Sequence, residues 1–147
     1  MPRVTRAALI QCANPLADCS DLNKVKQAMI DKHLPLIKQA AEQGAQVLCL
    51  QEIFNGPYFC AEQQTRWYDT AEPIPDGPTV KLMQEQAKKY GMVMVVPIYE
   101  KAMTGVYYNS AAVIDRPARP IAYSSSTSTC VPEASAVART KIARCGG

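Results

Sequence analysis

The sequence predicts an α/β layered domain, and three observations support this prediction. The first 50 residues read as strand, helix and strand, at residues 4–12, 21–43 and 47–50. This alternation of apolar runs and helical patterns continues to about residue 115. The composition is typical of a globular protein, with 48% hydrophobic and 20% charged residues, and a length of 147 residues fits one compact domain.

The first helix is predicted by apolar residues that recur at steps of three to five between residues 21 and 43. Asp21 or Ser20 can accept a hydrogen bond from the first turn as an N-cap, and Gly44 can end the helix. Pro35 has no backbone N–H, so we expect it to kink this helix or to shorten its first half.

The remaining elements follow in the same alternating order. Residues 47–50 are wholly apolar, which is typical of a strand that is covered on both faces. A second helical pattern is found at 79–90, and Gly91 is expected to end this helix. Two further strands are predicted at 92–97 and 107–115, joined by a turn at 104–105.

The character of the sequence changes at residues 116–147. Residues 1–115 carry 11 Lys and Arg against 12 Asp and Glu, whereas 116–147 carry 5 against 1. The latter segment has no sustained helical or strand periodicity, and residues 124–129 are all Ser or Thr. We therefore expect an irregular, disordered basic tail that does not belong to the domain at 1–115.

Several classes of protein are disfavoured by the composition. No run reaches the 18 or so apolar residues of a membrane span, and the tail offers only Tyr123 as an aromatic platform for nucleic acid. One histidine and the lack of any CxxC pair disfavour a metal site. Cys12 and Cys49 lie in apolar runs, where free packing thiols are common, so we expect a cytoplasmic protein.

Glu52 is the first candidate for a chemical role. It follows the apolar run at 47–50, and open α/β sheets place ligands at the carboxyl ends of such strands. The nearby aromatic residues Phe54, Tyr58 and Phe59 would lower the local dielectric constant, which suits a general base. The alternative is a loop carboxylate that makes a surface hydrogen bond.

Glu100 occupies a similar place, two residues after an apolar run that ends at Ile98. It could converge with Glu52 on one site, or it could be a hairpin residue paired with Lys101. His33 has no suitable partner near it in the sequence, so we predict a solvent-facing or partly packed helical residue without a role.

Four segments, taken in order, resemble the nitrilase superfamily of carbon–nitrogen hydrolases, and β-ureidopropionase-like members most closely. They are VTRAALIQ at 4–11, VLCLQEIFNGPYFC at 47–60, RWYDTAE at 66–72 and VMVVPIYEKAMTGVYYNSAAVID at 93–115. The resemblance covers about residues 1–115. It implies the N-terminal portion of a four-layer α-β-β-α sandwich.

The resemblance also implies a mechanism, in which a cysteine attacks the carbonyl or nitrile carbon, a glutamate transfers protons and a lysine stabilises the tetrahedral intermediate. Glu52 matches the general base, and Glu100 matches a supporting carboxylate. The family needs no cofactor and no metal. Its substrates are small amides or carbamoyl compounds such as N-carbamoyl amino acids, and its members form homo-oligomers.

The sequence departs from the family after Asp115. Neither Lys141 nor Cys130 stands in the context of the family's lysine or nucleophile, and Cys60 does not match the nucleophile either. We therefore predict that a change of reading frame near codon 115 has produced a truncated, inactive chain. The alternative is a short non-catalytic homologue that acts as a binding module or as a partner of a full-length relative.

Overall fold

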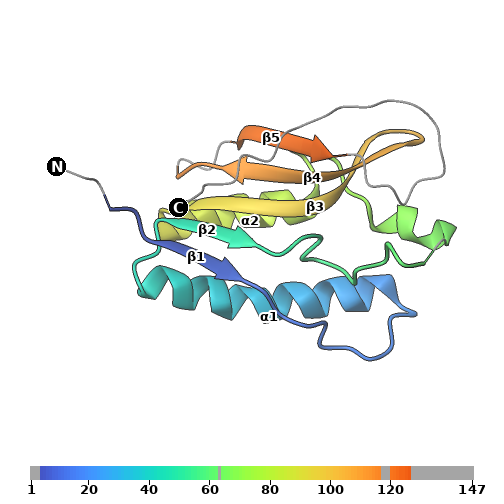
Figure 1. Ribbon diagram of the computed structural model, residues 1–147, viewed down its shortest axis with the longest axis horizontal. Coiled ribbons are helices and arrows are strands. Elements are labelled where there is room, and N and C mark those ends of the chain that lie inside the picture. The colour runs from blue at the N-terminus through green and yellow to red at the C-terminus, as the bar shows by residue number, and fades with distance from the viewer. Residues whose placement is uncertain (1–3, 63, 117–119, 127–147) are drawn as a thin grey trace.

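The computed structural model describes residues 4–62, 64–116 and 120–126, which form one five-stranded sheet with two helices (Figure 1). The strand order is β1-β2-β3-β4-β5; β1, β2 and β3 pair in parallel, and β3, β4 and β5 pair antiparallel. In chain order the elements are β1 (Ala7–Ile10), α1 (Leu22–Glu42), β2 (Val47–Leu50), the 3-10 helix η1 (Thr65–Thr70), α2 (Pro78–Tyr90), β3 (Val93–Met103), β4 (Val106–Ile114) and β5 (Pro120–Ser126).

Local signals in the sequence mark where α1 begins and where α2 ends. The carboxylate of Asp21 accepts a hydrogen bond of 3.1 Å from the backbone N–H of Lys24, which confirms the predicted N-cap of α1. Gly91 ends α2 in the left-handed conformation, with φ of +62°. Pro35 does not shorten α1, which continues through it to Glu42.

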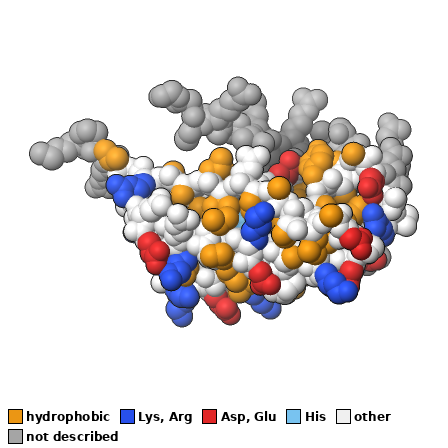
Figure 2. Space-filling view, turned by 90° about the horizontal axis from the view of Figure 1, so that it is seen from below, with side chains coloured by type: hydrophobic (Ala, Val, Ile, Leu, Met, Phe, Trp, Pro, Cys, Tyr) orange, Lys and Arg blue, Asp and Glu red, His pale blue; other side chains and the backbone are white. Residues whose placement is uncertain are grey.

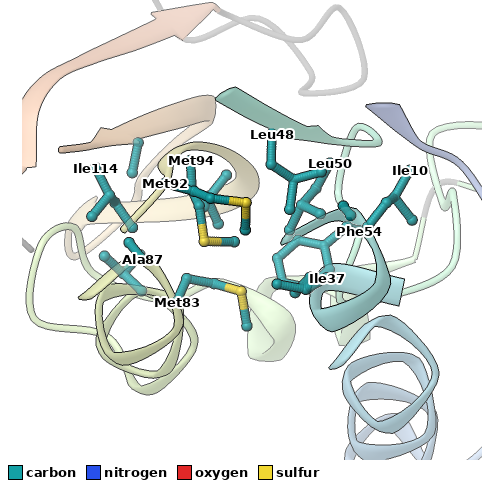
Figure 3. Close-up of a cluster of buried hydrophobic side chains, with 14 of the residues drawn as sticks. Ile10, Ile37, Leu48, Leu50, Phe54, Met83, Ala87, Met92, Met94 and Ile114 are labelled. Atoms are coloured by element: carbon teal, nitrogen blue, oxygen red, sulfur yellow. The ribbon is translucent and has the colours of Figure 1, made fainter. Parts of the chain in front are cut away.

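Both helices pack on one face of the sheet. Strand residues alternate between the two faces, and Leu48, Met94 and Ile114 point to the same side. They meet Ile37 of α1 and Met83 of α2 in a single cluster that is almost free of solvent (Figure 3). This contact buries the apolar stripe of each helix and holds the sheet and helix layers together.

The other face of the sheet has no helix on it among the residues that the structure describes. On β1, Ala8 and Ile10 pack towards the helices, whereas Leu9 points away and is 68% exposed. Val47 and Cys49 of β2 are half-buried, so the expectation that this strand is covered on both faces is wrong for the described part of the chain. We refer to the side that carries Leu9 and Cys49 as the open face.

The outer surface on the helical side of the molecule has a mixed composition. Seen from below, where α1 lies in Figure 1, hydrophobic side chains are interspersed with Lys, Arg, Asp and Glu (Figure 2). This mixture is typical of a surface that faces solvent. Within the described ranges no helix combines the length and the hydropathy that a membrane span requires.

The prediction of an irregular segment from residue 116 onwards needs a correction at Pro120–Ser126. These residues form β5, which pairs with β4 along most of its length. Without β5, the outer edge of β4 would offer unpaired backbone N–H and C=O groups, and an added strand satisfies them even where its sequence is rich in serine. Pro120 stands at the first position of β5, where proline is tolerated. Residues 117–119 and 127–147 lie outside the described part.

Candidate active site

Glu52 lies in the loop that leaves the carboxyl end of β2, as the sequence predicts. Its side chain is exposed, and Oε1 accepts a hydrogen bond from Nδ2 of Asn109, a residue of β4. Because β3 lies between β2 and β4, this hydrogen bond reaches across one strand of the sheet. The carboxylate of Glu52 is therefore held at a defined place while it stays accessible to a small molecule.

A strained turn follows Glu52 directly. Ile53 has φ of +48°, a left-handed conformation that is rare for a β-branched residue. Such strain persists only where surrounding contacts compensate for it. The contacts are present here, because Ile53, Phe54 and Asn55 are 3%, 0% and 6% exposed. The loop thus turns the Glu52 side chain outwards and buries the next three residues.

The aromatic residues that flank Glu52 have separate environments. Phe54 points into the core and makes an edge contact with His33, with ring centroids 5.1 Å apart. Tyr58 is 67% exposed. Phe59 stacks on Trp67 with ring centroids 5.3 Å apart, and it also contacts Tyr99, at 5.1 Å. Phe59 thus belongs to the aromatic cluster at this end of the sheet.

Glu100 does not emerge at a strand end, and the prediction of its position is wrong. It lies inside β3, is 4% exposed, and accepts a hydrogen bond from the hydroxyl of Ser110. Asn109 and Ser110 are neighbours on β4, so their side chains leave opposite faces of the sheet. Asn109 therefore contacts Glu52 on one face of the sheet, and Ser110 contacts Glu100 on the other face.

A third glutamate, Glu72, has the densest set of polar contacts at this end of the sheet, although no role was predicted for it. It is 5% exposed and forms an ion pair with Lys26 of α1. Thr79, in the first turn of α2, donates to it from its backbone N–H at 2.8 Å and from its hydroxyl at 2.6 Å. Asn55 of the Glu52 loop donates from Nδ2 at 3.4 Å.

A small cavity of about 60 Å³ lies between α1, the Glu52 loop and η1, beside Glu72. Its volume is large enough to hold water molecules. Lys26, Asn55, Asp69 and Glu72 supply polar groups to its wall. Among the described residues, no group of three or more His, Cys, Asp or Glu is arranged to hold a metal ion.

His33 differs from its prediction, because it is fully buried and has two polar partners. Its Nδ1 lies 2.7 Å from the carbonyl oxygen of Met29, which can only accept, so Nδ1 carries the proton. Nε2 is then free to accept from the thiol of Cys12, whose sulfur is 3.5 Å away. Burial lowers the pKa of His33 from its usual 6.5, and the neighbouring charge of Lys32 lowers it further, while the Met29 hydrogen bond opposes both.

The other described cysteines, Cys19, Cys49 and Cys60, are half-buried. Burial raises the pKa of Cys49, which disfavours its thiolate and fits the predicted packing role. Cys12 lies just after β1 rather than inside it, and its backbone N–H donates to the side-chain oxygen of Gln51 at 2.6 Å. Cys130 and Lys141 lie outside the described residues.

Comparison with known proteins places this geometry in a family. Residues 6–129 match the carbon–nitrogen hydrolase family, and this match continues past residue 115. A β-ureidopropionase of Arabidopsis thaliana is 38% identical over 115 residues, which is 77% of this chain and 28% of that protein. An N-carbamoylputrescine amidase of Solanum lycopersicum is 40% identical over 80 residues, or 54% of this chain and 26% of that protein.

Solved structures show the same fold. A carbon–nitrogen hydrolase from Helicobacter pylori G27 aligns with a TM-score of 0.69 and 23% identity, over 82% of this chain and 39% of that chain. A mutant of the amidase from Nesterenkonia sp. AN1, with the acetamide moiety of fluoroacetamide added covalently at its active-site cysteine, aligns with a TM-score of 0.59 and 21% identity, over 87% of this chain and 45% of that one.

The described sheet and helices therefore form one α layer and one β layer of the nitrilase-like α-β-β-α sandwich. The chain spans about a quarter of the length of the first two curated relatives. The match to the family extends over most of the sequence, from residue 6 to residue 129. This chain belongs to the carbon–nitrogen hydrolase family.

Proposed function

We propose that this chain supplies the general base, Glu52, to a site that hydrolyses N-carbamoyl amino acids or closely related small carbamoyl amides. The observation that carries the proposal is the position of Glu52: it is exposed at the carboxyl end of β2 and held by Asn109 from β4. The similarity to a β-ureidopropionase and to N-carbamoylputrescine amidases supports the carbamoyl substrate class.

In the proposed reaction the carboxylate of Glu52 takes the proton of a cysteine thiol as the sulfur attacks the substrate carbonyl carbon. The carbon–nitrogen bond then breaks, and the leaving nitrogen receives the proton from Glu52. Water hydrolyses the resulting S-carbamoyl intermediate with Glu52 again as base, the cysteine sulfur regains its proton, and the carbamic acid that leaves breaks down to carbon dioxide and the second amine. The covalent adduct at the active-site cysteine of the Nesterenkonia amidase supports the cysteine step. No cofactor or metal ion takes part in these steps.

The proposed role of Glu100 is that of a supporting carboxylate. Since it is buried in β3 and bonded to Ser110, it acts through the β3–β4 pair and not by contact with Glu52. Through its hydrogen bond with Ser110, Glu100 would fix the part of β4 that carries Asn109. Because Asn109 contacts Glu52 directly, a shift of β4 would move the base.

We propose that the 147-residue sequence does not itself supply the catalytic cysteine and lysine. The family's contexts for both are missing from the sequence, so the chain alone is expected to be inactive. Reading the coding DNA beyond codon 115 in all three frames tests the proposed frame change. A lysine segment and a cysteine strand end of the family type in another frame would support it. We also propose a cytoplasmic location and a homo-oligomeric complete enzyme.

A hybrid enzyme tests the role of Glu52. Residues 6–115 of this chain replace the matching residues of the Arabidopsis β-ureidopropionase, and ammonia release from N-carbamoyl-β-alanine is measured. We expect an active hybrid that loses at least about 100-fold in kcat when Glu52→Gln removes the base. Glu62→Gln is the matched control, because Glu62 is an exposed carboxylate that forms an ion pair with Arg66 on the surface. Activity that survives Glu52→Gln would contradict the proposal.

A second candidate, a non-catalytic binding module or partner of a full-length relative, is favoured by the open face with its exposed Leu9. Calorimetry of the 147-residue chain with N-carbamoyl-β-alanine would then show binding without ammonia release. Stable co-purification with a full-length relative would support partnering.

A further inference from the structure

We infer that Glu72 is a positioning residue that fixes the loop carrying Glu52. This inference rests on the proposed role of Glu52 as general base. Glu72 lies between η1 and α2, its side chain is 7% exposed, and nothing in the proposed chemistry uses it directly. A buried carboxylate is costly unless its charge and its lone pairs are satisfied, so its partners show what it holds together.

The partners of the Glu72 carboxylate are all donors, and they come from three separate parts of the chain. Lys26 of α1 supplies a positive charge, and Thr79 of α2 supplies a backbone N–H and a hydroxyl. The side-chain amide of Asn55 supplies the fourth donor. An ionised carboxylate accepts about four hydrogen bonds and donates none, so it fits this set of donors. A glutamine would turn an N–H group against at least one of them.

Asn55 connects this cluster to the base. It follows Glu52 by three positions, and the strained Ile53 lies between them. The Nδ2 group of Asn55 lies within hydrogen-bonding distance of both Glu72, at 3.4 Å, and the hydroxyl of Thr79, at 3.3 Å. A turn with positive φ at Ile53 relaxes unless both of its ends are held. Asn109 holds the Glu52 end, and Glu72 holds the Asn55 end.

The backbone of Glu72 fixes the cluster to the sheet. Its N–H donates to the carbonyl oxygen of Tyr99, and its own carbonyl accepts from the N–H of Lys101, each at 3.0 Å. These two bonds flank Glu100 on β3. The close approach also requires Gly77, where an added Cβ would lie 2.5 Å from the carbonyl oxygen of Pro73 and 3.0 Å from the Glu72 side chain. Glu72 is thus tied to β3 and to the Glu52 loop at the same time.

A simpler role for Glu72 would be to cap α2, because an anion at a helix N-terminus is favourable. The two roles affect different amides. A cap alone would protect the first turn of α2, where the N–H of Lys81 donates to Gly77 at 3.0 Å. A positioning role also protects the N–H of Gly56, which donates to the carbonyl of Ile53 at 3.1 Å inside the Glu52 loop.

Hydrogen–deuterium exchange of the full 147-residue chain separates the two roles, and it tolerates self-association. The variants are Glu72→Gln, which removes the charge and turns an N–H group against at least one donor, and Asn55→Ala, which removes the tether to the loop. Glu62→Gln serves as the control, because it alters a surface carboxylate that pairs with Arg66. We expect the exchange of Gly56 to accelerate at least about 10-fold in both test variants and to be unchanged in the control.

Two results would overturn the inference. In the first, Asn55→Ala leaves the exchange of the Gly56 amide unchanged. In this variant the Glu72 carboxylate keeps its ion pair with Lys26 and both hydrogen bonds from Thr79. The result is therefore informative even if Glu72→Gln fails to fold. In the second, Glu72→Gln accelerates only the amides of the first turn of α2. The exchange result does not depend on catalysis. If Glu52→Gln leaves the hybrid enzyme active, the proposed function fails while the positioning result stands.

Discussion

The side chain of Asn109 donates a hydrogen bond to the carboxylate of Glu52, a residue 57 positions earlier in the sequence. This contact links the antiparallel half of the sheet to the carboxyl end of its parallel half, because Asn109 lies on β4 and Glu52 follows β2. It gives an exposed side chain one preferred position. A general base needs such a position, since proton transfer requires donor and acceptor within hydrogen-bonding distance.

We predict that Asn109→Leu lowers kcat in the hybrid enzyme by about 10-fold or more while it changes stability by less than about 1 kcal/mol. The stability effect is small because the Glu52 carboxylate is exposed and regains a hydrogen bond from water. The rate falls because Glu52 loses its defined position. Ammonia release and urea denaturation measure the two quantities. Gln27→Ala, which removes an exposed bond to Asp31, should change neither.

Ser110→Ala should reduce the free energy of unfolding by about 1–3 kcal/mol. Ser110 and Glu100 are 2% and 4% exposed, so water cannot readily replace the lost donor and a buried carboxylate oxygen is left with one partner fewer. Urea denaturation of the full chain measures the loss. Ser20→Ala removes a similar hydroxyl-to-carboxylate bond, to Asp18, at an exposed site and should cost less than about 0.5 kcal/mol. Equal losses in the two variants would contradict this prediction.

The elements that could be predicted from the sequence are those with local causes. The caps at Asp21 and Gly91 and the glycine turn at Gly105 act within a few residues, and the structure confirms each of them. The place of Glu52 was also predictable, because it depends only on the end of an apolar strand. Family resemblance added the layered sandwich, which local pattern alone does not specify.

The features that the sequence did not reveal depend on distant partners. Glu100 was misplaced because the apolar run ends at Ile98, whereas the hydrogen bonds to β4 continue β3 as far as Met103. Glu72 has no local pattern, because its partners lie in α1, in the Glu52 loop and in α2. His33 was expected near solvent, since neither Phe54 nor Cys12 is close to it in sequence.

The open face of the sheet should make the chain associate with itself. Leu9 is 68% exposed on β1, which is an edge strand, and an exposed apolar edge favours pairing with another chain. We predict that Leu9→Lys shifts the chain towards monomer in size-exclusion chromatography with light scattering. Met103→Lys is the control, because Met103 is 65% exposed at the end of β3, and β3 is not an edge strand of this sheet. A wild-type chain that is already a stable monomer would contradict the prediction.

Burial of His33 should make the protein less stable in mild acid. The pKa of His33 is lowered in the folded protein, whereas the unfolded chain has the ordinary value of 6.5. The unfolded state therefore binds the proton more readily at low pH. The stability that comes from a neutral His33 is complete above about pH 6.5 and is lost progressively as the pH falls from there towards the folded-state pKa.

Urea denaturation under reducing conditions at pH 7.5, 6.5 and 5.5 measures this loss of stability. These pH values bracket the ordinary histidine pKa. We expect the unfolding free energy of the wild-type chain to fall across this range and that of His33→Gln to stay nearly constant. Asp18 and Asp21 do not confuse the result, because their pKa values lie below the ordinary 3.8, lowered mainly by backbone hydrogen bonds from Ser20 and Lys24. Both carboxylates remain ionised at pH 5.5. A parallel decline in the wild-type chain and in His33→Gln would show that another group, and not the buried imidazole, takes up the proton on unfolding.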